Sequence, residues 1–155
     1  MTRALVKGLG IGVLAVSVLG SGLMPVQAAD EPANVIKYRR NVMKAQGAHI
    51  TNIAAVAKGE VSFADNVPAD ARALAALIKL VPGLFPDGTD SGDTRALPAI
   101  WSDRAKFDAA AKTAGEAALA LAAAAESGDM TAITDALGKL GKACGDCHKP
   151  FRKEE

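Results

Sequence analysis

Apolar residues recur at helical spacing along four stretches of this 155-residue chain, and no stretch of strand length alternates apolar with polar residues. The four stretches cover residues 34–58, 68–80, 98–126 and 129–152, with glycine, proline or a capping residue near their ends. A longer segment rich in Gly, Pro, Asp and Thr, residues 82–97, separates the second stretch from the third. Helices with mostly short links pack side by side, so we expect an all-α fold, an antiparallel four-helix bundle.

The N-terminal residues 1–28 have the composition of a secretory signal peptide. Arg3 and Lys7 precede an uncharged, apolar stretch, and Val26 and Ala28 place small residues at the positions that determine cleavage. A retained membrane anchor is the alternative, but the stretch is short and glycine-rich for a span of about 20 residues. We therefore expect cleavage after Ala28, a single domain over residues 29–155, a periplasmic location and no stable membrane insertion.

The charge balance excludes one class of partner. The signal peptide holds two of the 18 basic residues and none of the 17 acidic ones, so the remaining chain has a net charge of −1. Nucleic-acid-binding domains usually carry a strong basic excess. We expect no nucleic-acid partner.

The only two cysteines stand in the run Cys144-Gly145-Asp146-Cys147-His148. This C-x-x-C-H spacing is typical of covalent c-type haem attachment, in which both sulfurs form thioethers and the adjacent imidazole binds the iron. A redox dithiol is one alternative, but it favours a βαβ context that the sequence lacks. A zinc site that adds His49 is another, but a second ligand pair is missing. We expect one covalently attached haem c, held by the C-terminal helix, with His148 as the proximal ligand.

The last helical stretch places both cysteines on one face. Ile133, Leu137, Leu140, Cys144, Cys147 and Phe151 follow one another at spacings of three and four residues. Gly138 and Gly141 cost helix stability; close approach of a flat macrocycle is one reason to keep them, and close packing of helices is the alternative. Arg152, four residues after His148, could pair with a haem propionate or remain in solvent near the helix end.

The first helical stretch carries polar residues on an otherwise apolar face. Arg39 and Gln46 share this face with Met43, and Arg39 and Met43 are one turn apart. Polar side chains on this face could contact a haem propionate or a ligand on the distal side of the iron. The Met43 thioether could complete a His/Met pair on the iron, or it could fill core space as most buried methionines do.

These residues together resemble the cytochrome c prime family, the class II c-type cytochromes. The resemblance rests on Ile36–Arg40, Met43-Lys44, Leu84–Pro86, Ala99–Asp103 and Gly141–Arg152. It implies a left-handed bundle, often a homodimer, tied to respiratory or photosynthetic electron transfer. It also implies that Arg39 lies near a propionate, that Met43 is the distal residue and that Arg152 lies close to the proximal histidine.

Two functions are compatible with this resemblance. The first is a periplasmic monohaem electron carrier, with His148 proximal and Met43 as distal ligand, that transforms no substrate and serves an unidentified periplasmic redox partner. We expect no enzymatic activity because no carboxylate pair, nucleophile or second histidine lies on the expected haem faces. The alternative is a five-coordinate haem protein that binds nitric oxide or carbon monoxide at an open iron, as high-spin members of the family do.

Overall fold

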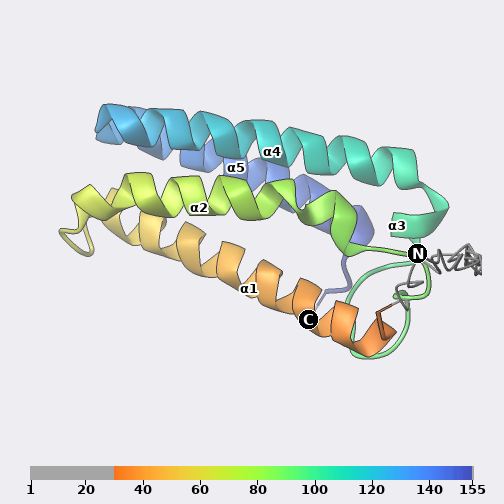
Figure 1. Cartoon of the computed structure of the whole chain (residues 1–155). Coiled ribbons are helices and arrows are strands. Elements are labelled where there is room, and N and C mark those ends of the chain that lie inside the picture. The colour runs from red at the N-terminus through yellow and green to blue at the C-terminus, as the bar shows by residue number, and fades with distance from the viewer. Residues whose placement is uncertain (1–29, 155) are drawn as a thin grey trace, which may run out of the picture.

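The computed structural model describes residues 30–154, so the predicted signal peptide lies outside the described residues. Four long helices form an antiparallel bundle, in which each helix runs opposite to the one before it (Figure 1). They are α1 (Pro32–Ala57), α2 (Val67–Lys79), α4 (Arg104–Ser127) and α5 (Met130–Phe151). The predicted all-α four-helix bundle is confirmed.

Local signals in the sequence explain where the helices begin and end. Pro32 occupies the first helical position of α1, where its missing N–H group would have no partner in any case. The tight link between α4 and α5 needs Gly128, which adopts a left-handed φ of 70°. Asp129 then begins α5 by accepting a hydrogen bond from the Thr131 backbone N–H at 2.9 Å.

The third predicted helix is interrupted, in contrast to the expected single helix over residues 98–126. A one-turn helix, α3 (Ala99–Ser102), comes first, and α4 begins at Arg104. Asp103 separates them because its backbone leaves the helical region, with φ −130° and ψ 58°. Its side chain accepts a hydrogen bond from the Lys106 backbone N–H at 3.3 Å, so the residue acts as the N-cap of α4.

The core consists of two clusters of buried side chains. The first lies among all four long helices and includes the fully buried Ile53, Leu74, Leu121 and Leu140. Small buried residues of α4 such as Ala118 let the helices approach closely. Burial of each Leu or Ile side chain contributes roughly 1.5–3 kcal/mol, so this cluster is a main source of stability.

The second cluster lies toward the end of the bundle where α3 and the long loop are found. Its aromatic rings form a chain of edge-to-face contacts, with centroids 5.0 Å apart for Phe85–Phe107 and 5.3 Å for Phe107–Phe151. Trp101 extends the chain, half-buried, and donates from Nε1 to the Pro86 carbonyl at 3.2 Å. These contacts join the loop to α4 and α5.

The connection between α2 and α3 is ordered by its packing on the bundle. It contains a short 3₁₀ turn, η2 (Val81–Leu84). Its residues 85–98 then pass the N-terminal end of α1 and the C-terminal end of α5. Another 3₁₀ turn, η1 (Ala64–Asn66), precedes α2. An isolated antiparallel bridge pairs Ala96 with Arg152, and no strand occurs in residues 30–154. Over the same residues, none of the helices is long and apolar enough to span a bilayer.

Candidate functional site

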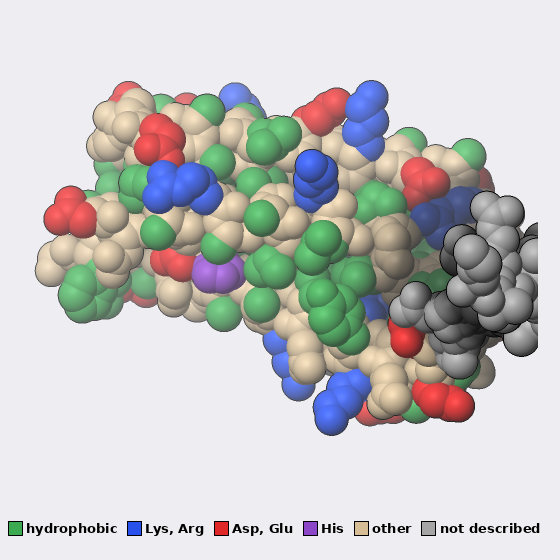
Figure 2. Space-filling view, viewed as in Figure 1, with side chains coloured by type: hydrophobic (Ala, Val, Ile, Leu, Met, Phe, Trp, Pro, Cys, Tyr) green, Lys and Arg blue, Asp and Glu red, His purple; other side chains and the backbone are tan. Residues whose placement is uncertain are grey.

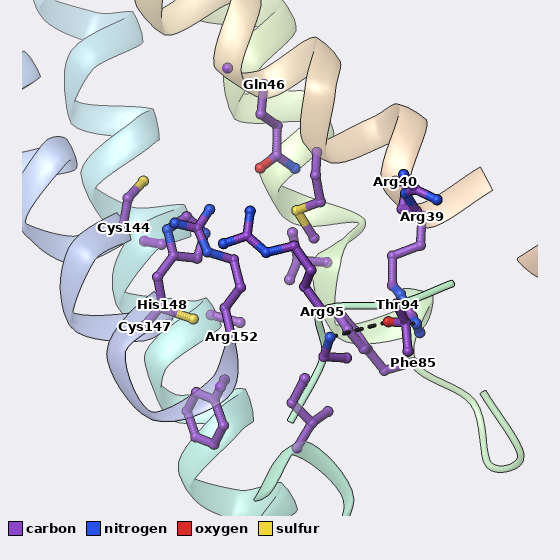
Figure 3. A pocket seen from close by; sticks show the side chains of 18 of the residues that line it. Arg39, Arg40, Gln46, Phe85, Thr94, Arg95, Cys144, Cys147, His148 and Arg152 are labelled. Carbon is purple, nitrogen blue, oxygen red and sulfur yellow. Dashed lines mark hydrogen bonds between the residues drawn. The ribbon is translucent and has the colours of Figure 1, made fainter. Parts of the chain in front are cut away.

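All six predicted site residues line one cavity of about 620 Å³ at the end of the bundle that holds the second core cluster (Figure 3). They are Arg39, Met43, Cys144, Cys147, His148 and Arg152. The cavity lies between α1 and α5, and residues 92–96 of the loop form part of its wall. Its volume falls within the range of roughly 300–1,000 Å³ that is usual for cofactor pockets.

The C-terminal helix supplies the sulfur and imidazole groups. Cys144, Cys147 and His148 are all half-buried, and no disulfide joins the two cysteines. Burial raises the pKa of both thiols, and the neighbouring Cys144 raises that of Cys147 further. The thiols are therefore protonated at neutral pH, with both sulfurs available at the edge of the cavity.

The His148 imidazole is electrically neutral at neutral pH. Burial lowers its pKa below the ordinary value, and the positive charges of Arg152 and Arg95 lower it further. A neutral imidazole keeps a lone pair on one ring nitrogen, which is the form that binds a metal. The cavity therefore presents an imidazole nitrogen that can bind a metal, next to two thiols on one helix.

The zinc alternative does not fit the geometry. Within residues 30–154, no group of three or more His, Cys, Asp or Glu side chains is arranged to hold a metal ion. His49, the fourth ligand that this alternative needs, pairs instead with Asp70 of α2, with 2.6 Å between Nδ1 and Oδ1. It is partly exposed and does not line the cavity.

Charged residues make the cavity strongly cationic. Among residues 30–154, five basic residues line it and one acidic residue does, Asp93, which pairs with Arg40 at the rim. The basic residues are Arg39, Arg40, Lys44, Arg95 and Arg152. This excess favours an anionic occupant, and the two propionates of haem supply such charge.

Arg39 is buried, with only 3% of its surface exposed, and it is bonded to the long loop. Its Nη1 donates to the Leu84 carbonyl at 3.3 Å and to Thr89 Oγ1 at 3.0 Å. Its Nη2 donates to the Thr89 carbonyl at 3.0 Å and to Thr94 Oγ1 at 2.8 Å. The guanidinium also stacks 4.5 Å from the centre of the Phe85 ring. Only the Nε–H group remains for another acceptor, so the role of Arg39 at a propionate stays a prediction.

The α1 wall of the cavity carries few donors for a metal. Met43 is half-buried and packs against the second core cluster. The Gln46 amide nitrogen donates to the Leu77 carbonyl at 3.2 Å. Ligation by the Met43 thioether stays a prediction.

Three features of the site differ from the sequence analysis or were missed by it. Gly138 and Gly141 are exposed and do not line the cavity, so the prediction that they accommodate a macrocycle is wrong. Thr89, buried to 2% exposure, and Arg95 were not singled out. Both lie in the loop, where no periodic pattern marks a side chain as facing the site.

The donor set therefore fits a covalently attached haem. Two thiols and a neutral imidazole stand on one helix, a cationic rim can meet two propionates, and apolar side chains such as Ile78, Ile100 and Phe107 line the interior. A helical bundle with this arrangement is that of a c-type haem protein with its attachment site on the last helix.

Comparison with known proteins identifies the family. Residues 34–152 match the family model described as Cytochrome C'. The chain is 38% identical to cytochrome c' of Rhodospirillum rubrum over 129 residues, 83% of this chain and 87% of that protein. The crystal structure of cytochrome c' from Rubrivivax gelatinosus has a TM-score of 0.75 at 36% identity, covering 80% of this chain and 98% of that one. A ferrous variant of cytochrome c prime from Alcaligenes xylosoxidans with bound nitric oxide has a TM-score of 0.76 at 30% identity, covering 82% and 99%.

The chain belongs to the cytochrome c' family, whose members bind one covalently attached haem c. The prediction of a single haem c is confirmed. The C-x-x-C-H run lies inside the matched region, at its C-terminal end.

Proposed function

We propose that this protein binds nitric oxide or carbon monoxide at an open face of its haem, and that it does so in the periplasm without transforming a substrate. The observation that carries the proposal is the difference between the two walls of the cavity. The α5 wall offers a neutral imidazole, whereas the neutral donors of the α1 wall are a thioether and an amide that is already hydrogen-bonded. The nitric oxide complex of the relative from Alcaligenes xylosoxidans supports the same function.

Each side chain has a distinct role in this proposal. Cys144 and Cys147 tether the haem, and His148 is its proximal ligand. Met43 lies on the opposite wall as a lid that limits the size of an incoming ligand. The bound haem supplies an iron centre for a small diatomic ligand. The apolar side chains of the second core cluster exclude water from the interior, and a small, uncharged ligand needs no charged partner there.

A second candidate function is electron transfer with Met43 as the distal iron ligand. The observation that favours it is the position of Met43, half-buried on the wall that faces α5. A thioether ligand would close the sixth position, raise the reduction potential and prevent gas binding unless it dissociated. The two functions therefore differ in whether the Met43 thioether binds the iron.

Absorption spectra of the purified holoprotein distinguish the two functions. We expect high-spin ferric and ferrous spectra, and saturable carbon monoxide binding to the ferrous protein. Met43→Leu keeps the size of the side chain but removes the sulfur, so it should leave the spin state unchanged. Met130→Leu at the start of α5 is a matched control, because Met130 packs on the first core cluster and does not line the cavity. A low-spin wild-type spectrum that Met43→Leu converts to high spin would refute the gas-binding proposal and establish the thioether ligand.

We also propose that the protein forms a homodimer through the outer face of α1 and α2. Hydrophobic side chains gather on this face (Figure 2). Tyr38 and Leu80 are 58% and 43% exposed, which leaves large apolar side chains in solvent. Light scattering should give twice the monomer mass, and Tyr38→Glu should halve it; a wild-type monomer at micromolar concentration would contradict this proposal.

Export and haem attachment have a common test. Mass spectrometry of the denatured mature protein should give the mass of residues 29–155 plus one haem. The double substitution C144S and C147S should remove the haem mass; its retention would contradict thioether attachment at these two positions.

A further inference from the structure

The side chains of His49 and Asp70 form a pair that joins α1 to α2 at the surface of the bundle. His49 Nδ1 lies 2.6 Å from Asp70 Oδ1. The two side chains are 29% and 19% exposed, so their neighbours shield both of them but both still reach the surface. Neither residue lines the cavity, and neither has a role in the functions proposed above.

This pair lies on the face of α1 and α2 that is proposed as the homodimer interface. His49 follows Tyr38 by eleven residues, which is about three turns of helix, so the two side chains project from the same side of α1. Ala45 stands between them on that side, and its small side chain leaves room for a second helix to approach. Figure 2 shows a histidine side chain among the hydrophobic side chains of this face. A second copy that packs on Tyr38 would therefore cover the pair as well.

The net charge of the pair depends on its own two groups. Within residues 30–154, neither His49 nor Asp70 forms a second ion pair. Other charged groups of α1, α2 and the elements that pack on them have their own partners or are exposed to solvent. They include Lys44 at the cavity, Arg72 paired with Glu126 of α4, Lys142 paired with Asp146 of α5, and Asp65 of η1. With His49 protonated the pair is neutral overall, and with His49 neutral it keeps the single negative charge of Asp70.

Titration of His49 therefore changes the charge that a dimer must bury. An imidazole ordinarily changes its charge between about pH 5 and 8. In a dimer with twofold symmetry each copy brings the same patch, so two pairs enter the interface. At acidic pH each pair is compensated internally, whereas at alkaline pH each brings a carboxylate without a countercharge into a contact built on apolar side chains. A buried charge without a countercharge is unfavourable, and two such charges also repel each other.

We propose that the His49–Asp70 pair makes the association of two copies through α1 and α2 depend on pH, with the tighter dimer formed where His49 is protonated. Association then takes up protons, so the dissociation constant rises as the pH rises through the range in which His49 loses its proton. The inference rests on the proposed homodimer and names the side chains that regulate it. It applies whether the protein binds gas or carries electrons.

Sedimentation equilibrium of the holoprotein at about pH 5.5 and about pH 8 tests the proposal. The wild-type dissociation constant should be about tenfold larger at the higher pH. H49Q keeps a polar side chain without a titratable group, so its dissociation constant should change less than about twofold. The same variant retains His148, so it also measures any pH dependence that comes from the cavity. D70N leaves a protonated imidazole without a countercharge, so it should reverse the dependence and give the weaker dimer at the lower pH.

A wild-type dimer with the same dissociation constant at both pH values would overturn the proposal while leaving the homodimer intact. A pH dependence that is retained in H49Q, or that is unchanged in D70N, would also overturn it. A wild-type monomer at both pH values and micromolar concentration would refute the homodimer and this inference together. If H49Q does not fold, the reversal expected in D70N still decides the question.

Discussion

Replacement of Arg39 by methionine should destabilise the protein far more than replacement of its neighbour Arg40. Arg39 donates four hydrogen bonds to the loop and is 97% buried, whereas the Arg40 side chain is 45% exposed and pairs with Asp93. Both substitutions remove one positive charge from α1 and keep an unbranched side chain of helix-favouring type. The difference in stability between the two variants therefore measures the contribution of the buried hydrogen bonds of Arg39.

The expected loss follows from the contacts of Arg39. Hydrogen bonds from charged groups contribute roughly 1.5–3 kcal/mol each to stability. Removal of the guanidinium also removes the desolvation cost of a buried charge, several kcal/mol, which offsets part of that loss. The Thr89 and Leu84 carbonyls are left without this donor in a region that water does not reach freely. We expect R39M to lower the free energy of unfolding by about 3 kcal/mol, against less than about 1 kcal/mol for R40M.

Urea denaturation of the two holoprotein variants, followed by far-ultraviolet circular dichroism, measures this difference. Hydrogen exchange should also become faster in R39M at residues 84–94, because the loop loses its anchor on α1. A loss below about 1 kcal/mol for R39M, or equal losses for the two variants, would refute the reasoning that the network holds the loop.

Three further predictions follow from the last helix. In protein purified without haem, alkylation of Cys144 and Cys147 should be slower at pH 8 than alkylation of an unstructured cysteine peptide, because burial raises the pKa of both thiols; equal rates would contradict this. The same haem-free protein should lose stability as the pH falls below about 6.5, because the pKa of His148 is lowered in the folded state and the unfolded chain binds a proton first; H148Q should remove that part of the pH dependence in urea titrations. G141A should raise the free energy of unfolding by about 0.5–1 kcal/mol, since the added methyl group has nothing within 4 Å to meet; a destabilised holoprotein would contradict this prediction.

The helices and the attachment motif were predictable because both depend on local sequence. Spacings of three and four residues place Cys144, Cys147 and Phe151 on one face, and the structure has all three at the cavity or in the cluster beneath it. The capping residue Asp129 and the left-handed Gly128 likewise act through their immediate neighbours.

The loop and its contacts could not be predicted in the same way. Thr89 is buried because Arg39, fifty residues earlier, donates to both its hydroxyl and its carbonyl oxygen. Arg95 reaches the cavity because residues 151–153 pair with the loop, and no period in either segment encodes that pairing. The break at Asp103 has a capping side chain as its signal, but apolar residues at helical spacing on both sides, such as Ile100 and Phe107, concealed it.

The division of the core into two clusters has a consequence for how such a protein can diversify. The first cluster is built from α1, α2, α4 and α5 and lies mostly away from the cavity, whereas the second contains the aromatic residues and the loop that surround it. Substitutions at positions such as Leu74 or Leu121 should change the melting temperature with little effect on the spectrum of the haem. Substitutions at Phe85 or Phe107 should change both. Thermal tolerance can therefore change at one set of positions without a change at the haem, whereas a change around the haem also alters stability.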